Sequence, residues 1–302
     1  MAETGTAIAP DDLGRPGRLV DVDDAQLYVV EVGAPGNYPI VVLHGGPGLD
    51  HHEFADYLDP LTERGFRLIL VDQRASGRSP ACDPATWTLR KMSEDVGSLA
   101  DSMGLERYAV LGHSYGAFVA LQNAVDFPGR ASQTIVSGGV PSARFLADVE
   151  ANLAAFEPVE LRRQVTESWE RETKIRTGED FASIMHDQLP FHFADPLDPR
   201  IEEYERRTAG TVYSPDVLRV FAANDYGSID VEGRLKEITQ PVLVTTGRYD
   251  RTCTPAASEA IAAGAPAAEL VFFEHSGHMT FVEEPDEYLA AVEDFLRRNG
   301  AG

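Results

Sequence analysis

The stretch RYAVLGHSYGAFVALQNAV at residues 107–125 joins an apolar, strand-like run to a helix-forming run through the five residues GHSYG. Gly112 and Gly116 flank Ser114 in a G-x-S-x-G pattern. A serine on a sharp turn between a strand and a helix needs glycines beside it, because a Cβ there would meet neighbouring backbone. The stretch therefore predicts a buried strand, a strained turn that presents Ser114, and a helix.

Similar short apolar runs alternate with amphipathic stretches along the chain. Such alternation predicts an α/β fold, with a mostly parallel sheet covered by helices on both faces. The expected strands are residues 26–32, 40–43, 67–72, 107–112, 133–139, 241–247 and 269–274. The expected helices are residues 51–64, 90–103, 115–126, 255–263 and 284–298.

Residues 141–240 break this alternation. The segment is charged, carries Trp169 and several other aromatic residues, and has a helical rather than a strand-like pattern. It is too long for a loop between two strands. We therefore predict a core formed by residues 1–140 and 241–302, with residues 141–240 inserted as a helical cap.

Length and composition limit the class of protein. The 302 residues suit one α/β domain with an insertion, and 43% of them are hydrophobic. No run approaches the ~18 apolar residues of a membrane span, and residues 1–20 lack the pattern of a secretory signal. We expect a cytoplasmic protein with reduced thiols at Cys82 and Cys253. A net charge of −23 disfavours nucleic acid and anionic membranes as partners.

A serine hydroxyl needs a base, and the base needs an orienting acid. Asp250 follows the expected strand 241–247, and His278 follows the strand 269–274. His275 is a competing base, but His278 lies past Gly277, where a loop can carry the ring back towards the serine. We therefore predict Ser114 as nucleophile, His278 as base and Asp250 as orienting acid.

The run HGGPG at residues 44–48 follows the strand 40–43. Attack on a carbonyl places negative charge on its oxygen, which backbone N–H groups can stabilise. The expected donors are the N–H groups of Gly46 and Tyr115, the second of which follows the serine. A phosphate-binding loop would need a following Lys-Ser/Thr pair, which is absent.

Asp50, His51 and His52 could suggest a metal site. Adjacent histidines at a helix start point to different faces, however, and no further ligand spacing follows. Capping and solvent exposure explain these residues better, so we expect neither a metal nor a cofactor.

Five motifs together resemble the prolyl aminopeptidases, also called proline iminopeptidases. They are HGGPG at 44–48, DQRASGRS at 72–79, GHSYG at 112–116, GRYD at 247–250 and SGHM at 276–279. The resemblance implies an α/β-hydrolase fold with a helical cap, no metal, and release of an N-terminal residue, often proline, from short peptides or arylamides. It also implies triad roles for Ser114, Asp250 and His278, and oxyanion-hole roles for Gly46 and Tyr115.

The sequence departs from the family where the substrate amine would bind. In one branch a glutamate follows the catalytic aspartate, whereas this chain has Arg251. Asp225 in the run Asn224-Asp225-Tyr226 is the closest match to the second acid of the family, and Glu202, Glu203 and Glu205 are alternative anchors. A guanidinium would repel an ammonium group.

Two functions therefore stay open. The first is an aminopeptidase-like serine hydrolase, and the second is a hydrolase of carboxylic esters, lactones or amides that uses the same triad. The expected partner is a small-molecule or short-peptide substrate, and the sequence leaves the oligomeric state open. A non-catalytic binding protein would not need both a nucleophile and a base. Dehalogenases and epoxide hydrolases of this fold would need an aspartate in place of Ser114.

Overall fold

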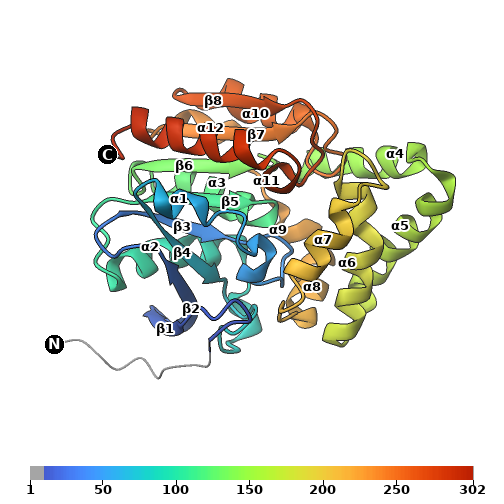
Figure 1. Cartoon of the computed structure of the whole chain (residues 1–302), viewed down its shortest axis with the longest axis horizontal. Helices are drawn as coiled ribbons and strands as arrows, with labels where there is room; N and C mark the ends of the chain where they lie inside the picture. Colours follow the sequence, from blue (N-terminus) through green and yellow to red (C-terminus); the bar gives the residue numbers. More distant parts are fainter. Residues whose placement is uncertain (1–9, 302) are drawn as a thin grey trace.

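A computed structural model describes residues 10–301 of the chain. One eight-stranded sheet crosses the molecule in the order β1-β2-β4-β3-β5-β6-β7-β8 (Figure 1). The pairs β1–β2 and β2–β4 are antiparallel, and the remaining pairs are parallel. The strands are β1 (Gly17–Val22), β2 (Ala25–Val32), β3 (Tyr38–Leu43), β4 (Phe66–Asp72), β5 (Ala109–His113), β6 (Gln133–Ser137), β7 (Val242–Gly247) and β8 (Ala268–Phe273).

Helices cover both faces of the sheet because successive strand residues point to opposite sides. In β3, Val41 and Leu43 pack with side chains of α2, α3 and α10. Ile40 and Val42 pack on the other face, with side chains of α1, α11 and α12. These elements are α1 (Pro60–Glu63), α2 (Leu89–Ser102), α3 (Tyr115–Asp126), α10 (Pro255–Gly264), α11 (Thr280–Glu283) and α12 (Pro285–Arg298), with the 3-10 helices η1 (His51–Phe54) and η2 (Pro84–Thr86).

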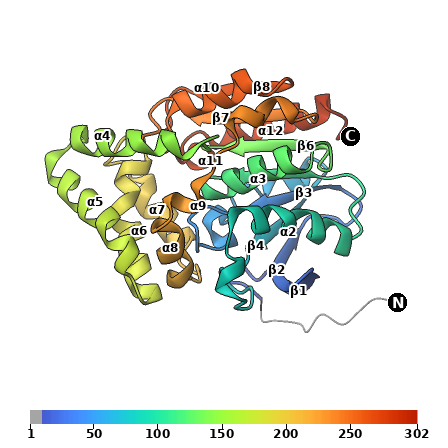
Figure 2. The same ribbon diagram turned by 180° about the vertical axis from the view of Figure 1, so that it is seen from behind.

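The insertion between β6 and β7 is helical, and α4 to α8 gather at one end of the sheet (Figures 1 and 2). From Ile229 onward the chain returns to the core, where Leu235 and Ile238 pack in the same cluster as α3. The elements of the insertion are η3 (Ala143–Ala147), α4 (Asp148–Ala155), α5 (Val159–Arg171), η4 (Glu172–Lys174), α6 (Gly178–His192), α7 (Arg200–Arg207), α8 (Pro215–Ala222), α9 (Asp225–Ser228) and η5 (Glu232–Glu237). We keep the word cap for residues 141–240.

The predicted α/β fold is confirmed, with three local differences. Strand β1 was not expected. The single helix predicted over residues 51–64 divides into η1 and α1, because Ala55 adopts φ 42° and ψ −119° and Pro60 begins a new helix. The predicted solvent exposure of His51 and His52 is wrong, since each is only 1% exposed.

Cys82 and Cys253 are both free thiols, as expected. Within residues 10–301, none of the helices combines the length and the apolar character that a bilayer crossing requires.

Candidate active site

Ser114 lies on the tight turn between β5 and α3, with φ 53° and ψ −120°. A non-glycine residue rarely adopts this conformation, which places the serine above the end of the strand. The turn closes tightly on both sides. A Cβ on Gly112 would lie 2.0 Å from the carbonyl oxygen of Gly116, and a Cβ on Gly116 would lie 2.1 Å from that of Leu43. Glycine at both positions is therefore a steric requirement.

His278 and Asp250 meet beside this turn, although they follow different strands. The Nδ1 atom of His278 lies 2.8 Å from Oδ2 of Asp250. The other carboxylate oxygen, Oδ1, accepts hydrogen bonds from the N–H groups of Thr252 and Cys253 at 2.8 and 2.9 Å. The acid is therefore fixed, and it orients the imidazole so that Nε2 is left for the substrate side.

The surroundings of His278 favour a single cationic imidazole. Burial acts to lower the pKa of His278, but the charge and hydrogen bond of Asp250 outweigh it and raise this pKa. The rings of His113 and His192 lie 4.8 and 5.3 Å from the ring of His278. Burial, together with the charge of His278, lowers the pKa of His113 well below its ordinary value and that of His192 to about 3. His275, the competing base, is exposed and donates its N–H to Glu284.

The HGGPG loop lies against the serine. A Cβ on Gly45 would lie 2.9 Å from the Cβ of Ser114, and Gly46 and Tyr115 both line the cavity in front of the serine. The N–H of Tyr115 belongs to the first turn of α3, so it has no acceptor within the helix. The two predicted oxyanion donors therefore border one space with Ser114.

This cavity has a volume of about 320 Å³ and is lined by residues of both the core and the cap. Ser114 and His278 line it from the core side. Most of the remaining lining is apolar, and it includes Leu49, Phe118, Leu153, Trp169, Phe181 and Leu218. Among the described residues that line the cavity there is no lysine or arginine. Its walls therefore suit an apolar substrate, and its charge comes from acids.

Two of the carboxyl groups that line the cavity belong to buried glutamates. Glu53 is 6% exposed, and its Oε2 accepts the N–H of Gly45 at 2.5 Å. Glu172 is 4% exposed and accepts hydrogen bonds from Gln188, at 2.8 Å, and from the hydroxyl of Tyr226. Burial raises the pKa of Glu53 to about 8 and that of Glu172 to about 7. Both carboxylates are therefore costly to ionise until a cation approaches.

The three residues predicted to bind substrate do not line this cavity. Arg251 lies beneath the cap, where its guanidinium donates to the carbonyl oxygens of Phe191, Phe193 and Ala194. Asp225 and Glu203 are exposed, and Glu203 lies 3.5 Å from Arg207 on its own helix. These side chains point away because carbonyl groups, solvent and neighbouring charges satisfy them.

Neither Glu53 nor Glu172 was predicted from the sequence as a site residue. The run Asn224-Asp225-Tyr226 does contribute to the cavity, but through Tyr226, which donates to Glu172. Glu53 closely follows the HGGPG motif, and that proximity was a usable signal. Glu172 lies in the cap, where no motif marks it.

Comparison with known proteins agrees with this geometry. The sequence pattern of the alpha/beta hydrolase fold family matches residues 38–285. A protein from Heyndrickxia coagulans named proline iminopeptidase is 30% identical over 271 residues, which are 86% of this chain and 91% of that protein. A crystal structure of proline iminopeptidase from Mycobacterium smegmatis superposes with a TM-score of 0.72 at 25% identity, over 94% of this chain and 98% of that one.

An esterase from Exiguobacterium antarcticum shares the fold, with a TM-score of 0.73 at 22% identity over 92% of this chain and 98% of that one. The chain is therefore a hydrolase that belongs to the alpha/beta hydrolase fold family. Within that fold it is a member of the proline iminopeptidase family.

The close approach at Gly116 gives a first prediction. Gly116→Ala should lower the free energy of unfolding by about 3 kcal/mol, because a Cβ would overlap the backbone of β3. Urea unfolding measures this change. Gly36→Ala is the control, since a Cβ at Gly36 meets nothing within 4 Å. Equal free energies of unfolding in the two variants would contradict the close approach of Gly116 to the backbone of β3.

Proposed function

We propose that this hydrolase releases an N-terminal residue, proline or another, from short peptides or amides through an acyl-enzyme on Ser114. The observation that carries this proposal is the cavity in front of Ser114, whose apolar walls hold two buried glutamates and, among the described lining residues, no lysine or arginine. We also propose a cytoplasmic location, in which the free thiols of Cys82 and Cys253 would stay reduced.

In the proposed mechanism, the Ser114 oxygen attacks the carbonyl carbon while Nε2 of His278 takes the hydroxyl proton. The oxyanion accepts hydrogen bonds from the N–H groups of Gly46 and Tyr115. His278 then gives its proton to the leaving amine as the carbon–nitrogen bond breaks. A water molecule, activated by the same imidazole, releases the acyl group and restores Ser114. Asp250 keeps the imidazole oriented and stabilises its positive charge throughout.

The position of Glu53 supports recognition of a free amine. The amine of an N-terminal residue lies roughly 2.5 Å from its own carbonyl carbon, given standard bond lengths. An amine anchor must therefore lie close to the serine. The Oε1 atom of Glu53 and the Cβ of Ser114 lie 2.6 and 2.9 Å from the same point, the position a Gly45 Cβ would take.

Electrostatics supports the same assignment. A buried ammonium group needs carboxylates close by, since desolvation without a partner is costly. Glu53 and Glu172 are costly to ionise alone, so a substrate cation and these acids would stabilise one another. Arg251, which sequence alone suggested would repel an amine, donates instead to cap carbonyl groups. An ester or lactone hydrolase would have no use for two such acids.

The role of Ser114 is tested by Ser114→Ala. This change should abolish turnover and leave the melting temperature within about 2 °C of the wild type, because only one hydroxyl is lost. A fluorophosphonate should label Ser114 in the wild type and nothing in the variant, as peptide mass mapping can measure. Retained turnover in the purified variant would exclude the proposed nucleophile.

The role of the amine is tested by comparing proline p-nitroanilide with its N-acetylated form. Acetylation should lower kcat/KM about 100-fold, because the charged hydrogen bonds to buried carboxylates are lost. A p-nitrophenyl ester without an amine serves as the control for an intact triad. Equal rates on the free and blocked anilides would favour the ester, lactone or amide hydrolase instead.

The variant Glu172→Gln tests the effect of the Glu172 carboxylate on substrate binding and, separately, on the stability of the protein. Its KM for proline p-nitroanilide should rise at least about tenfold, while ester hydrolysis stays near the wild-type rate. Burial raises the folded-state pKa of Glu172 above its ordinary value of 4.5 to about 7. Below pH 4.5 the carboxyl group is neutral in both the folded and the unfolded state, and the folded protein has its full stability. As the pH rises through 7 the buried group must ionise, and that stability is lost. The variant avoids that loss and should be more stable at pH 8, by up to about 3 kcal/mol.

Glu203→Gln is the matched control, because Glu203 is an exposed cap acid outside the cavity. It should change neither KM nor stability. A tenfold effect in this control, or none in Glu172→Gln, would contradict the assignment of Glu172 as an amine anchor.

A further inference from the structure

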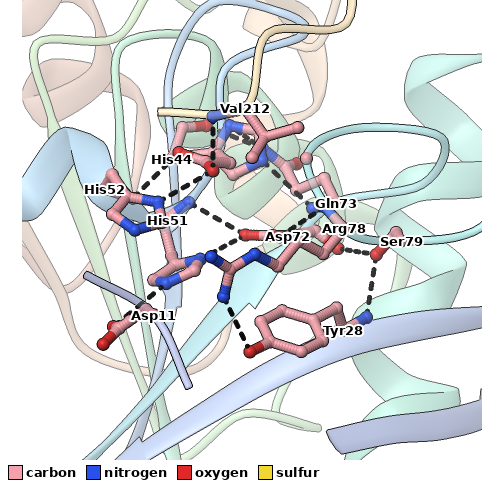
Figure 3. Close-up of polar contacts among 12 residues, drawn as sticks. Asp11, Tyr28, His44, His51, His52, Asp72, Gln73, Arg78, Ser79 and Val212 are labelled. Carbon is pink, nitrogen blue, oxygen red and sulfur yellow. Dashed lines mark hydrogen bonds and ion pairs between the residues drawn. The ribbon is translucent and has the colours of Figure 1, made fainter. Parts of the chain in front are cut away.

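A second polar cluster lies outside the active-site cavity, at the start of η1. Figure 3 shows His51 between Asp11, from the N-terminal segment, and Asp72, at the end of β4, with His52 beside His51. Both histidines are 1% exposed, and Asp11 is 6% exposed. None of these residues lines the active-site cavity. The proposed hydrolysis therefore does not account for so many buried ionisable groups.

Hydrogen bonds fix the orientation of both imidazole rings. Nδ1 of His51 lies 2.6 Å from Oδ1 of Asp72, and Nδ1 of His52 lies 2.8 Å from Oδ2 of Asp50. Carboxylates accept hydrogen bonds, so each Nδ1 carries the hydrogen and each neutral ring has a lone pair on Nε2. A carboxylate on one ring nitrogen is the arrangement that typically supports a histidine bound to a metal through the other nitrogen.

Nε2 of His51 faces the carboxylate of Asp11, and His52 lies close to both. One ligand atom from each of Asp11, His51 and His52 lies within 4.8 Å of the other two. Within the described part of the chain, Oδ2 of Asp11 and both Nε2 atoms have no hydrogen-bond partner. Buried polar atoms are usually paired, so three unpaired atoms facing one another need an explanation.

The distances suit a tetrahedral metal ion. Nε2 of His51 and Oδ2 of Asp11 are 3.5 Å apart, which is long for a hydrogen bond. Two ligands of a tetrahedral zinc ion with bonds of roughly 2.1 Å lie about 3.4 Å apart. Oδ1 of Asp12 lies 2.8 Å from Nε2 of His52, without the angle of a hydrogen bond, and its side chain is 41% exposed. This contact is shorter than the roughly 3.4 Å between two tetrahedral ligands, so Asp12 would have to move outward to become the fourth ligand, which its exposed side chain allows. Its exposure also gives the ion a route from solvent.

We propose that Asp11, His51 and His52 bind a divalent transition-metal ion of the zinc class, with Asp12 or a water molecule as the fourth ligand. Two imidazoles and a carboxylate are ligands that zinc accepts. The ion would be structural. It would fasten the N-terminal segment to η1, whose residue Glu53 holds the HGGPG loop through the N–H of Gly45.

The same ion would also stabilise the cap, through the carboxylates that hydrogen-bond to its two histidine ligands. Asp50, which orients His52, also accepts the N–H of Val212 at 2.9 Å (Figure 3). Asp72, which orients His51, also accepts the N–H groups of His51 and Arg78. The metal would therefore stabilise a hydrogen-bond network that joins the N-terminal segment, the sheet and the cap.

A proton on His51 is the competing occupant. Burial acts to lower the pKa of His51, but the nearby carboxylates of Asp11 and Asp72 outweigh it and raise this pKa to about 9. Such a proton would pair His51 with Asp11 and leave Nε2 of His52 unpaired, whereas a metal ion engages all three atoms. Direct metal binding distinguishes the two occupants.

The test uses the full-length protein, stripped with a chelator and dialysed into buffer with excess Mg²⁺ to block weak surface acids. Titration with Zn²⁺ should give one site per chain, and Co²⁺ should give the strong visible absorption of a four-coordinate ion. Zinc should raise the melting temperature, because the ion binds the folded state alone. A wild-type protein without stoichiometric binding of either ion would overturn the proposal and leave the proton as occupant.

Variants assign the ligands. Asp11→Asn keeps the shape of the side chain but removes the charge, and it should weaken zinc binding at least tenfold, as should His52→Gln. His186→Gln is the matched control, since His186 is an exposed histidine paired with Glu205. Unchanged affinity in both Asp11→Asn and His52→Gln would overturn the ligand assignment. An unchanged melting temperature in a protein that binds zinc stoichiometrically would overturn the structural role.

Discussion

The active site depends on how closely the first turn of α3 approaches the ends of β3 and β5. Gly112 and Gly116 leave no room for a side chain, and Ser114 takes up the strain in its own backbone. The same approach brings the HGGPG loop after β3 against the serine. A single steric constraint therefore places Ser114, the first N–H of α3 and the glycine loop around one point.

Charge is arranged around that point in two different ways. On one side, Asp250 is held by two backbone N–H groups and orients a histidine whose neighbouring rings are neutral. On the other side, Glu53 and Glu172 are buried, and none of the described cavity residues is a lysine or an arginine. Burying these two acids costs stability, which is common at sites whose groups have shifted pKa values. The free energy for ionising these acids would come from the substrate.

Much of this arrangement could be predicted from the sequence. The parallel strands, Ser114, Asp250 and His278 follow from local patterns, because the ends of parallel strands meet at one edge of a sheet. The predicted substrate-binding residues lie outside the cavity. Asp225 was chosen by its match to a family segment and Arg251 by its place after Asp250, whereas Glu203 was an alternative acid that no motif marks. Whether such a side chain enters the cavity depends on the packing of cap helices, which no local pattern encodes. His51 and His52 were misplaced for a similar reason, as their neighbour Asp11 lies far upstream.

The sequence by itself determined the chemistry of the turn, because glycine spacing and strand ends are local properties with short-range steric causes. It also determined the α/β class and the helical character of the insertion. Only the tertiary structure decided which acids lie in the cavity and which histidines are buried together. Burial, and with it the pKa of a carboxyl group, is a property of the surroundings that distant segments supply. Glu172 and Asp225 differ little as residues, and the packing of the cap alone makes one a buried acid and the other a solvated one.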